Sequence, residues 1–215
     1  MISVILMMAG SSSRMNQKEN KLFLQLGNKL VFEHSLEMFL NNGLDVICVT
    51  KPEYIHYLSK YENKVKIVLG GETRQESVYN GLVACQNDYV MIHDAARPLI
   101  TQRIIDDCKE AINEGKCFLV AKESKDSVYS KNPFKALKRD NIIMAQTPQG
   151  GPKSVLLNAH INAKNDNYIS TDDISLLMKY SNEEIKIIDG DDHNFKITTQ
   201  LDYILAKELV NLWLE

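Results

Sequence analysis

No apolar run in the 215-residue chain approaches the ~20 residues that a membrane-spanning helix needs. The apolar segment Ile2–Met8 is not preceded by a basic region or followed by a small-residue cleavage site, as it would be in a secretory signal peptide. The chain also lacks the excess of Lys and Arg that marks a general nucleic-acid-binding surface, because its formal net charge is -3. We therefore expect a cytoplasmic protein that binds neither membranes nor nucleic acid.

Cysteine is scarce and widely spaced. The chain has four cysteines, with no C-x-x-C pair and no histidines at a zinc-binding spacing. Each lies in an apolar strand or helix pattern, where a free thiol behaves as a small hydrophobic side chain. We predict that Cys48, Cys85, Cys108 and Cys117 are core residues and that the protein's own side chains form no metal site.

The chain has no internal repeat, low-complexity run or linker that would divide it, so residues 1–215 are expected to form a single domain. Short apolar runs alternate with amphipathic segments, which is typical of an α/β protein with a mostly parallel twisted sheet and helices on both faces. The predicted strands are Ile2–Met8, Leu44–Val49, Val65–Leu69, Tyr89–Ile92, Cys117–Ala121 and Glu184–Ile188.

Apolar residues at helical spacing predict the helices between these strands. The predicted helices cover residues 32–40 with Gly43 as the C-cap, Tyr54–Tyr61, a segment from the Gly70-Gly71 turn to about Cys85, a segment capped by Thr101 and ended by Gly115, Lys153–Ala163, and a segment capped by Thr171-Asp172-Asp173. The last helix has Leu201, Ile204, Leu205, Leu209 and Leu212 on one face, which we expect to pack on the core.

The alternation breaks between Lys122 and Ala145, where the chain is polar and basic and contains Pro133. Two short pieces, Ser127–Tyr129 and Ile142–Met144, are predicted to pair as an antiparallel ribbon. We interpret the segment 122–145 as an arm that leaves the main sheet, and exposed arms often pair with another subunit. The alternative is a disordered loop.

The first strand ends in a loop that is rich in small residues and carries two cations, Ala9-Gly10-Ser11-Ser12-Ser13-Arg14-Met15 and then Lys21. Glycine allows close approach of the backbone to a ligand, and free amide hydrogens in such a loop can contact phosphate oxygens. Arg suits bidentate phosphate contacts, whereas Lys acts as a mobile point charge. The loop lacks the remaining glycines of G-x-G-x-x-G and the Gly-Lys-Ser/Thr of a P-loop, so a solvated turn is the alternative.

Ligands of open α/β sheets bind beyond the carboxyl ends of the strands, so the loops after several strands are candidates for one shared site. These loops contain Gly71, Glu72, Arg74 and Ser77, then Asp94, Ala95 and Arg97, while Lys196 lies near the end of the chain. No Cys–His or Ser–His pair stands out as a nucleophile with its base. His93 is interpreted as holding its loop by a backbone hydrogen bond, with a role as base as the alternative. Asp94 is a candidate for contacts to a cation or to hydroxyl groups, with an Asx turn as the alternative.

Six sequence elements in the same order resemble the 2-C-methyl-D-erythritol 4-phosphate cytidylyltransferase family of the non-mevalonate isoprenoid pathway. They are Ala9-Gly10 with Arg14-Met15 and Lys21, Gly70-Gly71 with Arg74 and Ser77, His93-Asp94-Ala95-Ala96-Arg97-Pro98, Gln146-Thr147-Pro148-Gln149, Thr171-Asp172-Asp173, and Asn194-x-Lys196-x-Thr198. The sibling ribitol-5-phosphate cytidylyltransferases usually have Ser-Val where this chain has Ala95-Ala96. The chain departs from the family at Met8, at Ser11–Ser13, at Asn20, where many members have Pro, and at Gly150-Gly151.

The resemblance implies a Rossmann-like nucleotidyltransferase fold of the GT-A-like type, and attack of a sugar-alcohol phosphate on the α-phosphorus of CTP with release of pyrophosphate. It implies that Arg14, Lys21 and Lys196 stabilise the triphosphate and the transition state, and that Arg139 reaches the site from the arm of a second subunit in a homodimer. The nucleotide would contact Met8, Ala9, Gly10, Gly71, Glu72, Ser77 and Ala95, and the sugar phosphate would contact Asp94, Arg97, Ser127 and Thr147. Mg²⁺ would be bound mainly through the CTP phosphates.

Two alternatives remain open from the sequence. The first is a cytidylyltransferase for another polyol phosphate, such as ribitol 5-phosphate. The second is a catalytically silent nucleotide-binding regulator. Retention of Arg14, Lys21 and Lys196 together argues against silence, because a binding module does not need so many cations.

Overall fold

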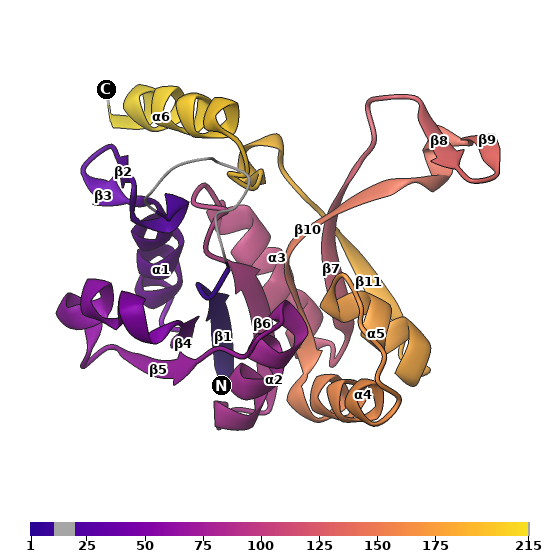
Figure 1. Ribbon diagram of the computed structural model, residues 1–215, viewed down its shortest axis with the longest axis horizontal. Helices are drawn as coiled ribbons and strands as arrows, with labels where there is room; N and C mark the ends of the chain where they lie inside the picture. Colours follow the sequence, from indigo (N-terminus) through magenta and orange to yellow (C-terminus); the bar gives the residue numbers. More distant parts are fainter. Residues whose placement is uncertain (11–19, 215) are drawn as a thin grey trace.

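The computed structural model describes residues 1–10 and 20–214. Its centre is a seven-stranded sheet with the order β11-β7-β10-β6-β1-β4-β5 (Figure 1). The strands are β1 (Ile2–Met7), β4 (Asp45–Thr50), β5 (Val65–Leu69), β6 (Tyr89–Asp94), β7 (Cys117–Glu123), β10 (Ile143–Pro152) and β11 (Ile185–Asp189). The pairs β1–β4, β1–β6, β4–β5 and β7–β11 are parallel, so the predicted mostly parallel sheet is confirmed.

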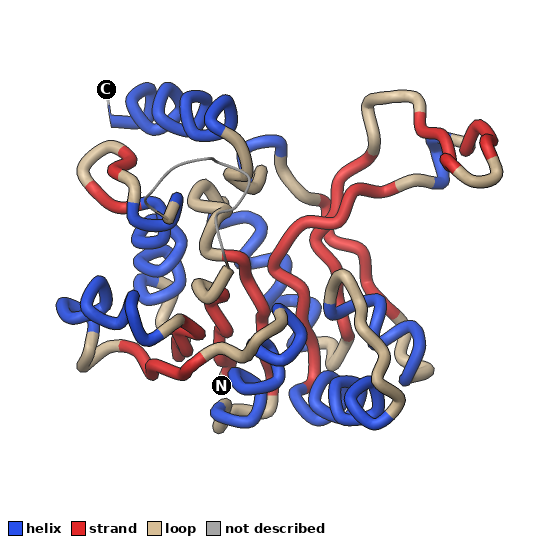
Figure 2. The backbone as a smooth tube through the Cα atoms, in the orientation of Figure 1, coloured by secondary structure: helices blue, strands red, loops and turns tan. Residues whose placement is uncertain are grey.

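Helices cover both faces of the sheet, as the sequence predicts (Figure 2). Apart from the segment 122–145, the elements outside the sheet are η2 (Lys21–Phe23), β2 (Gln25–Leu26), β3 (Lys29–Leu30), α1 (Val31–Asn41), η3 (Pro52–Tyr61), α2 (Arg74–Ala84), α3 (Gln102–Asn113), α4 (Lys153–Asn165), α5 (Asp173–Tyr180), η5 (Asp192–Asn194) and α6 (Gln200–Leu214). The side chains of Thr73, Thr101 and Asp172 accept hydrogen bonds from backbone amides in the first turns of α2, α3 and α5. These caps satisfy amides that have no partner within the helix.

The two-residue period of the strands divides the core into two layers. Val4 and Leu6 of β1 pack with α1, α3 and α6, whereas Ile5 between them packs with α2, α4 and α5. Successive side chains of a strand point to opposite faces, so a fully apolar strand requires helices on both sides. Cys48 and Cys108 lie in the first layer and Cys85 and Cys117 in the second, which confirms their prediction as core residues.

Strand β10 was not predicted, and it corrects the expected ribbon. Ile143 and Met144 pair with Glu123 and Lys122 of β7, so the segment Ile142–Met144 does not pair with Ser127–Tyr129. The chain from Gln146 to Gly151 continues β10 between β6 and β7, and after an irregularity between Ala145 and Gln149 it pairs antiparallel with both neighbours. Its sequence, QTPQGG, is low in β-branched and aromatic residues, so it lacks the usual signal of a buried strand.

Close packing explains the Gly150-Gly151 pair in this strand. A Cβ added at Gly150 would overlap the carbonyl oxygen of Val90 and lie 2.6 Å from Cζ of Phe118, and one at Gly151 would lie 2.9 Å from Sγ of Cys117. Glycine in a strand interior often marks such an approach of a neighbouring chain segment. The departure from the family pattern at this point is therefore a packing feature of the sheet.

The predicted arm is present and projects away from the main sheet (Figure 1). Its tip is the hairpin of β8 (Val128–Lys131) and β9 (Phe134–Leu137), followed by η4 (Arg139–Asn141). The Tyr129 and Phe134 rings stack with their centroids 5.4 Å apart, and both side chains are largely exposed. The segment is therefore an ordered β-arm with apolar side chains at its tip, rather than a disordered loop.

Of the five apolar residues predicted to pack the last helix on the core, only Leu209 does so, and it is partly buried, so the predicted face is wrong for the other four. Leu201 and Leu212 are 74% and 66% exposed, and Ile204 and Leu205 are about half exposed, whereas Ala206 and Val210 are buried. The start of α6 fixes this rotation, because the carboxylate of Asp202 accepts hydrogen bonds from the backbone amides of Thr198 and Thr199. The helix thus contacts the body through a narrow stripe of smaller residues and leaves most of its leucines outside.

Candidate active site

A cavity of about 350 Å³ lies at the carboxyl ends of β1, β4, β5 and β6. This is the edge of the sheet at which the sequence places one shared site, and the loops after these four strands meet there. The cavity is lined by Met7, Ala9, Gly10, Lys21, Leu22, Lys51, Gly71, Glu72, Thr73, Arg74, Ser77, Asp94, Ala96 and Lys196. Eight of the predicted site residues are therefore brought together, namely Ala9, Gly10, Lys21, Gly71, Glu72, Ser77, Asp94 and Lys196.

The glycine turn before α2 forms one wall of the cavity. Ser77 Oγ accepts a hydrogen bond from the Gly71 amide at 3.0 Å and donates to the Thr73 carbonyl at 2.8 Å. A Cβ added at Gly70 would lie 2.6 Å from the Cβ of Ala9, so the turn packs against the first loop only because it carries glycine. Ser77 thus fixes the shape of a wall made mostly of backbone.

The first loop is closed by Asn20, the position where the sequence departs from the family's proline. Its side-chain amide donates to the Gly10 carbonyl at 3.1 Å, and its Oδ1 accepts from the Leu22 amide at 3.1 Å. Asn20 therefore connects both ends of the loop and caps the turn that carries Lys21 into the cavity. The predicted residue Arg14 lies outside the described residues.

Asp94 is the buried anion of the cavity. Its Oδ2 lies 2.7 Å from Lys196 Nζ, and its Oδ1 lies 3.7 Å from Arg74 Nε. Burial alone would raise the pKa of Asp94, but Lys196 and Arg74 outweigh burial and hold that pKa well below its usual range. The side chain is therefore ionised at neutral pH and pairs with cations. The turn that follows is closed by the backbone carbonyl of Asp94, which accepts a hydrogen bond from the Arg97 amide.

His93 and Thr147 hold the backbone on both sides of the Asp94 side chain. His93 is buried, its Nε2 lies 3.1 Å from the Arg97 carbonyl, and its Nδ1 lies 3.1 Å from Thr147 Oγ1. Thr147 Oγ1 also accepts a hydrogen bond from the Asp94 amide at 3.1 Å. Burial lowers the pKa of His93 to about 4, so the ring is neutral near pH 7. The interpretation of His93 as a residue that holds its loop agrees with this geometry.

Several predicted site residues do not line the cavity. The Met8 side chain and Ala95 are buried in the core, and Thr147 lies beneath Asp94. Arg97 Nη1 donates to the Asn194 carbonyl at 2.7 Å and braces the segment before Lys196. The assignment of Met8 and Ala95 to the nucleotide, and of Arg97 and Thr147 to the sugar phosphate, stays a prediction.

Lys51 and Ala96 line the cavity but are missing from the predicted contacts, and Arg74, which the sequence places in the candidate shared site, has no predicted contact there. Lys51 directly follows β4, and Arg74 begins α2 after β5. The rule that ligands bind at strand carboxyl ends applies to the β4 loop as well, and it would have found Lys51. Arg74 stands in one of the family-like motifs, but only the structure brings it to Asp94 and Asp173.

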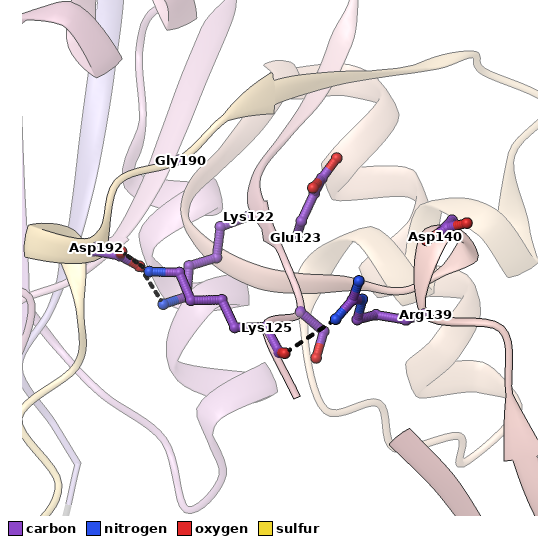
Figure 3. A pocket seen from close by; sticks show the side chains of 8 residues that line it. Lys122, Glu123, Lys125, Arg139, Asp140, Gly190 and Asp192 are labelled. Carbon is purple, nitrogen blue, oxygen red and sulfur yellow. Dashed lines mark hydrogen bonds and ion pairs between the residues drawn. The ribbon is translucent and has the colours of Figure 1, made fainter. Parts of the chain in front are cut away.

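The two predicted arm residues, Ser127 and Arg139, lie away from this cavity. Arg139 lines a second cavity of about 600 Å³ at the root of the arm, together with Lys122, Glu123, Ser124, Lys125, Asp140, Gly190 and Asp192. Lys122 and Lys125 both pair with Asp192, and Arg139 Nη1 donates to the Lys125 carbonyl at 3.4 Å (Figure 3). Within the described part of the chain, the two cavities share no lining residue.

The charges of the first cavity suit a polyanion better than a protein-bound metal. Lys21, Lys51, Arg74 and Lys196 face two carboxylates, Glu72 and Asp94. Among residues 1–10 and 20–214, no three His, Cys, Asp or Glu side chains lie close enough to hold a metal ion. None of the helices in the described ranges combines the length and the apolar character of a membrane-crossing segment.

Nearly the whole chain matches known proteins of one family. The family model for 2-C-methyl-D-erythritol 4-phosphate cytidylyltransferase matches residues 2–211. The protein of that name from Clostridioides difficile is 34% identical over 99% of this chain and 94% of its own length, and that from Aquifex aeolicus is 36% identical over 98% of both.

Solved structures agree with this match. The 4-diphosphocytidyl-2C-methyl-D-erythritol synthase of Anaerococcus prevotii superposes with a TM-score of 0.86 at 26% identity, covering 98% of both chains. The 2-C-methyl-D-erythritol 4-phosphate cytidylyltransferase of Francisella tularensis gives a TM-score of 0.80 at 30% identity, covering 96% of this chain and 98% of its own.

Proposed function

Because the chain belongs to the 2-C-methyl-D-erythritol 4-phosphate cytidylyltransferase family, we propose that it transfers the cytidylyl group of CTP to 2-C-methyl-D-erythritol 4-phosphate. This reaction serves the biosynthesis of isoprenoid precursors. The observation that carries the proposal is the cavity at the carboxyl ends of four strands, where backbone-rich walls meet the side chains of Lys21 and Lys196. A polyol phosphate other than this one is less well supported, because the curated relatives at 30–36% identity are named for the erythritol substrate.

The reaction needs positioned charges more than a proton acceptor. A phosphate monoester has its second pKa near ~6, so the attacking phosphate is already mostly a dianion at neutral pH. One of its oxygens bonds to the α-phosphorus of CTP, the bond from that phosphorus to the bridging oxygen of the β-phosphate breaks, and pyrophosphate leaves with the electron pair. No general base is required, which fits a buried His93 whose two ring nitrogens are already engaged.

Lys21 and Lys196 are proposed to neutralise charge that develops on the phosphoryl oxygens and the leaving pyrophosphate, joined by Arg14. Lys196 pairs with Asp94 in the cavity. A triphosphate that enters the cavity competes for this ammonium group, and Asp94 keeps Arg74 as a neighbouring cation when Lys196 turns to the ligand. Asp94 thus holds Lys196 in place before the substrate arrives, which limits the reorganisation needed on binding.

Mg²⁺ is proposed to bind mainly through the phosphates of CTP. The residues of the cavity fit this arrangement, because its lining has two carboxylates, Glu72 and Asp94, and no three His, Cys, Asp or Glu side chains of the described residues lie close enough to hold the ion by themselves. When bound, the ion offsets charge on the phosphate oxygens and orients them.

Removal of divalent cations is expected to abolish pyrophosphate release. A chelator in excess should stop turnover, and added Mg²⁺ should restore it, because the ion would supply charge stabilisation that the cavity's lysines alone do not provide. Turnover that persists in the presence of the chelator would contradict the proposed cofactor.

CTP is expected to be strongly preferred over ATP, GTP and UTP. The proposed base site lies against Ala9, Gly10 and Gly71 in a cavity of about 350 Å³, where the peptide groups have fixed donor and acceptor positions. A wrong base leaves such groups unpaired, and a purine is also too large. The measurement is kcat/KM for the four nucleotides, and comparable values for UTP or a purine would contradict the base site.

The same pyrophosphate-release assay separates the remaining alternatives. With CTP and a panel of polyol phosphates, the protein should favour 2-C-methyl-D-erythritol 4-phosphate. A preference for ribitol 5-phosphate would instead indicate a ribitol-5-phosphate cytidylyltransferase. A silent regulator would bind CTP and release no pyrophosphate with any acceptor.

The protein is proposed to act as a cytoplasmic homodimer. Four free, buried cysteines are consistent with a reducing compartment. The exposed Tyr129 and Phe134 at the tip of the arm offer apolar surface to a second subunit. In such a dimer, Ser127 and Arg139 of the arm would contact the sugar phosphate bound by the other subunit.

A further inference from the structure

A chain of polar contacts runs from the wall of the nucleotide cavity into the interior. Arg74 lines the cavity, and its Nη2 donates to Asp173 Oδ2 at 2.8 Å. His160 Nε2 lies 3.2 Å from the other oxygen of this carboxylate, Asp173 Oδ1. Asp173 and His160 are both buried, whereas Arg74 keeps 32% of its side chain exposed. A buried residue of α4 is thus two contacts away from a cation of the cavity.

Asp173 is held firmly on its backbone side. It is the first residue of α5, and Gln149 Oε1 accepts hydrogen bonds from the amides of Asp173 and Ile174 at 3.1 and 3.3 Å. Burial would raise the pKa of Asp173, but Arg74 and His160 outweigh it and bring that pKa below its usual range. The residue is therefore a carboxylate with a fixed Cα, whose two oxygens have one partner each.

The proton of His160 is placed by its neighbours. A carboxylate can only accept, so the proton lies on Nε2 and is donated to Asp173 Oδ1. His160 Nδ1 is buried and has no hydrogen-bond partner among the described residues, so the contact from Nε2 is the hydrogen bond that orients the ring. His160 thus serves as a single directed donor.

We propose that His160 is a positioning residue of the nucleotide site, which orients the Asp173 carboxylate so that Asp173 fixes the guanidinium of Arg74 at the cavity wall. An arginine side chain has many rotamers, and a ligand that must order it binds more weakly than one that meets it already in place. This inference rests on the proposed function, because it assigns Arg74 to the binding of CTP.

The test compares two substitutions of His160. In His160→Leu the donor is lost, and KM for CTP is expected to rise roughly five- to tenfold with kcat changed less than about twofold. In His160→Gln the side-chain amide keeps an N–H of similar reach, and KM is expected to stay within about twofold of the unaltered protein. An unchanged KM in His160→Leu, or an equal rise in His160→Gln, would overturn the proposal.

A double-mutant cycle shows whether His160 acts through Arg74. Arg74→Ala should raise KM for CTP, and adding His160→Leu should then change it by less than about twofold, because the group that His160 positions is gone. Effects that multiply would mean that His160 acts by another route. Leu156→Ala, which removes a buried side chain one turn earlier on α4, is the matched control and should lower the Tm without raising KM.

A calorimetric titration with CTP alone distinguishes this inference from the proposed function. Kd is expected to follow KM across the variants, and the titration does not require turnover. If the unaltered protein binds CTP and fails to release pyrophosphate, the proposed function fails while the His160 comparison is still decided by Kd. If Kd is the same in His160→Leu and the unaltered protein, the positioning role is wrong whatever the activity.

Discussion

Replacing Lys21 with Ala is expected to lower kcat by about 10²-fold or more, with a smaller change in KM for CTP. Lys21 lies at the start of η2, directly after Asn20, and it lines the cavity together with Gly71 of the glycine turn. A charge at this place acts on oxygens that gain negative charge as the α-phosphorus is attacked, so its loss raises the barrier more than it weakens binding.

Two further variants make the Lys21 test specific. Lys21→Arg keeps the charge but is not expected to restore the full rate, because a planar guanidinium occupies different space from an ammonium group. Lys186→Ala removes a lysine that pairs with Glu114 on the surface and should leave kcat unchanged. Near-normal turnover in Lys21→Ala would mean that Lys21 is a surface charge and that the first loop is not a phosphate site.

The sheet was predictable because interior strands such as β1 and β4 are apolar on both faces. Ile2–Met7 and Asp45–Thr50 alternate between two cores, and such runs show clearly in a sequence. Strand β10 was not predictable in this way. Its glycines are selected by contact with Val90 and Phe118, and its Gln146 and Gln149 side chains bond to segments far along the chain. Tertiary contacts of this kind have no periodic signal.

The face of α6 was predicted wrongly for a related reason. The spacing of its leucines is that of a buried helix, but the Asp202 contacts and the smaller residues Ala206 and Val210 decide which side meets the body. Hydrophobic periodicity indicates an apolar face, and it does not reveal whether that face packs within the same subunit.

The candidate site was predictable where residues follow strands and harder to predict where they support one another. Gly71, Asp94 and Lys21 were found from strand ends and charge. The motif residues Gln149 and Asp173 were recognised only as family-like, and the structure gives their physical role in anchoring α5 and Arg74. A supporting contact such as Arg74–Asp173 joins residues about a hundred positions apart, so no local sequence pattern reveals it.

Arg139→Ala is expected to raise KM for the sugar phosphate far more than KM for CTP. Arg139 begins the short helix η4 on the arm, is exposed, and donates to the Lys125 carbonyl. It lines the cavity at the root of the arm and not the one that holds Lys21. An arginine fork suits a phosphate monoester, so in the proposed homodimer it would complete the site of the neighbouring subunit.

Mixed dimers provide the sharper test of this placement. Each proposed site takes Lys21 from one subunit and Arg139 from the other, so a dimer of Lys21→Ala with Arg139→Ala has one site with both defects and one with neither. Each variant alone should be nearly inactive. An equal mixture that exchanges subunits freely should recover up to about a quarter of the unaltered activity, because half of the dimers are mixed and each has one intact site.

The negative control for recovered activity is a mixture of Arg139→Ala with the double variant Lys21→Ala/Arg139→Ala, in which no site is intact. This mixture should stay inactive under the same conditions, because every pairing leaves the sugar phosphate without its arginine. If Lys21→Ala and Arg139→Ala form mixed dimers, as shown by two affinity tags, and activity does not return, Arg139 acts within its own subunit. In that case the arm does not complete the neighbouring site, and the exposed Tyr129 and Phe134 at its tip need another explanation.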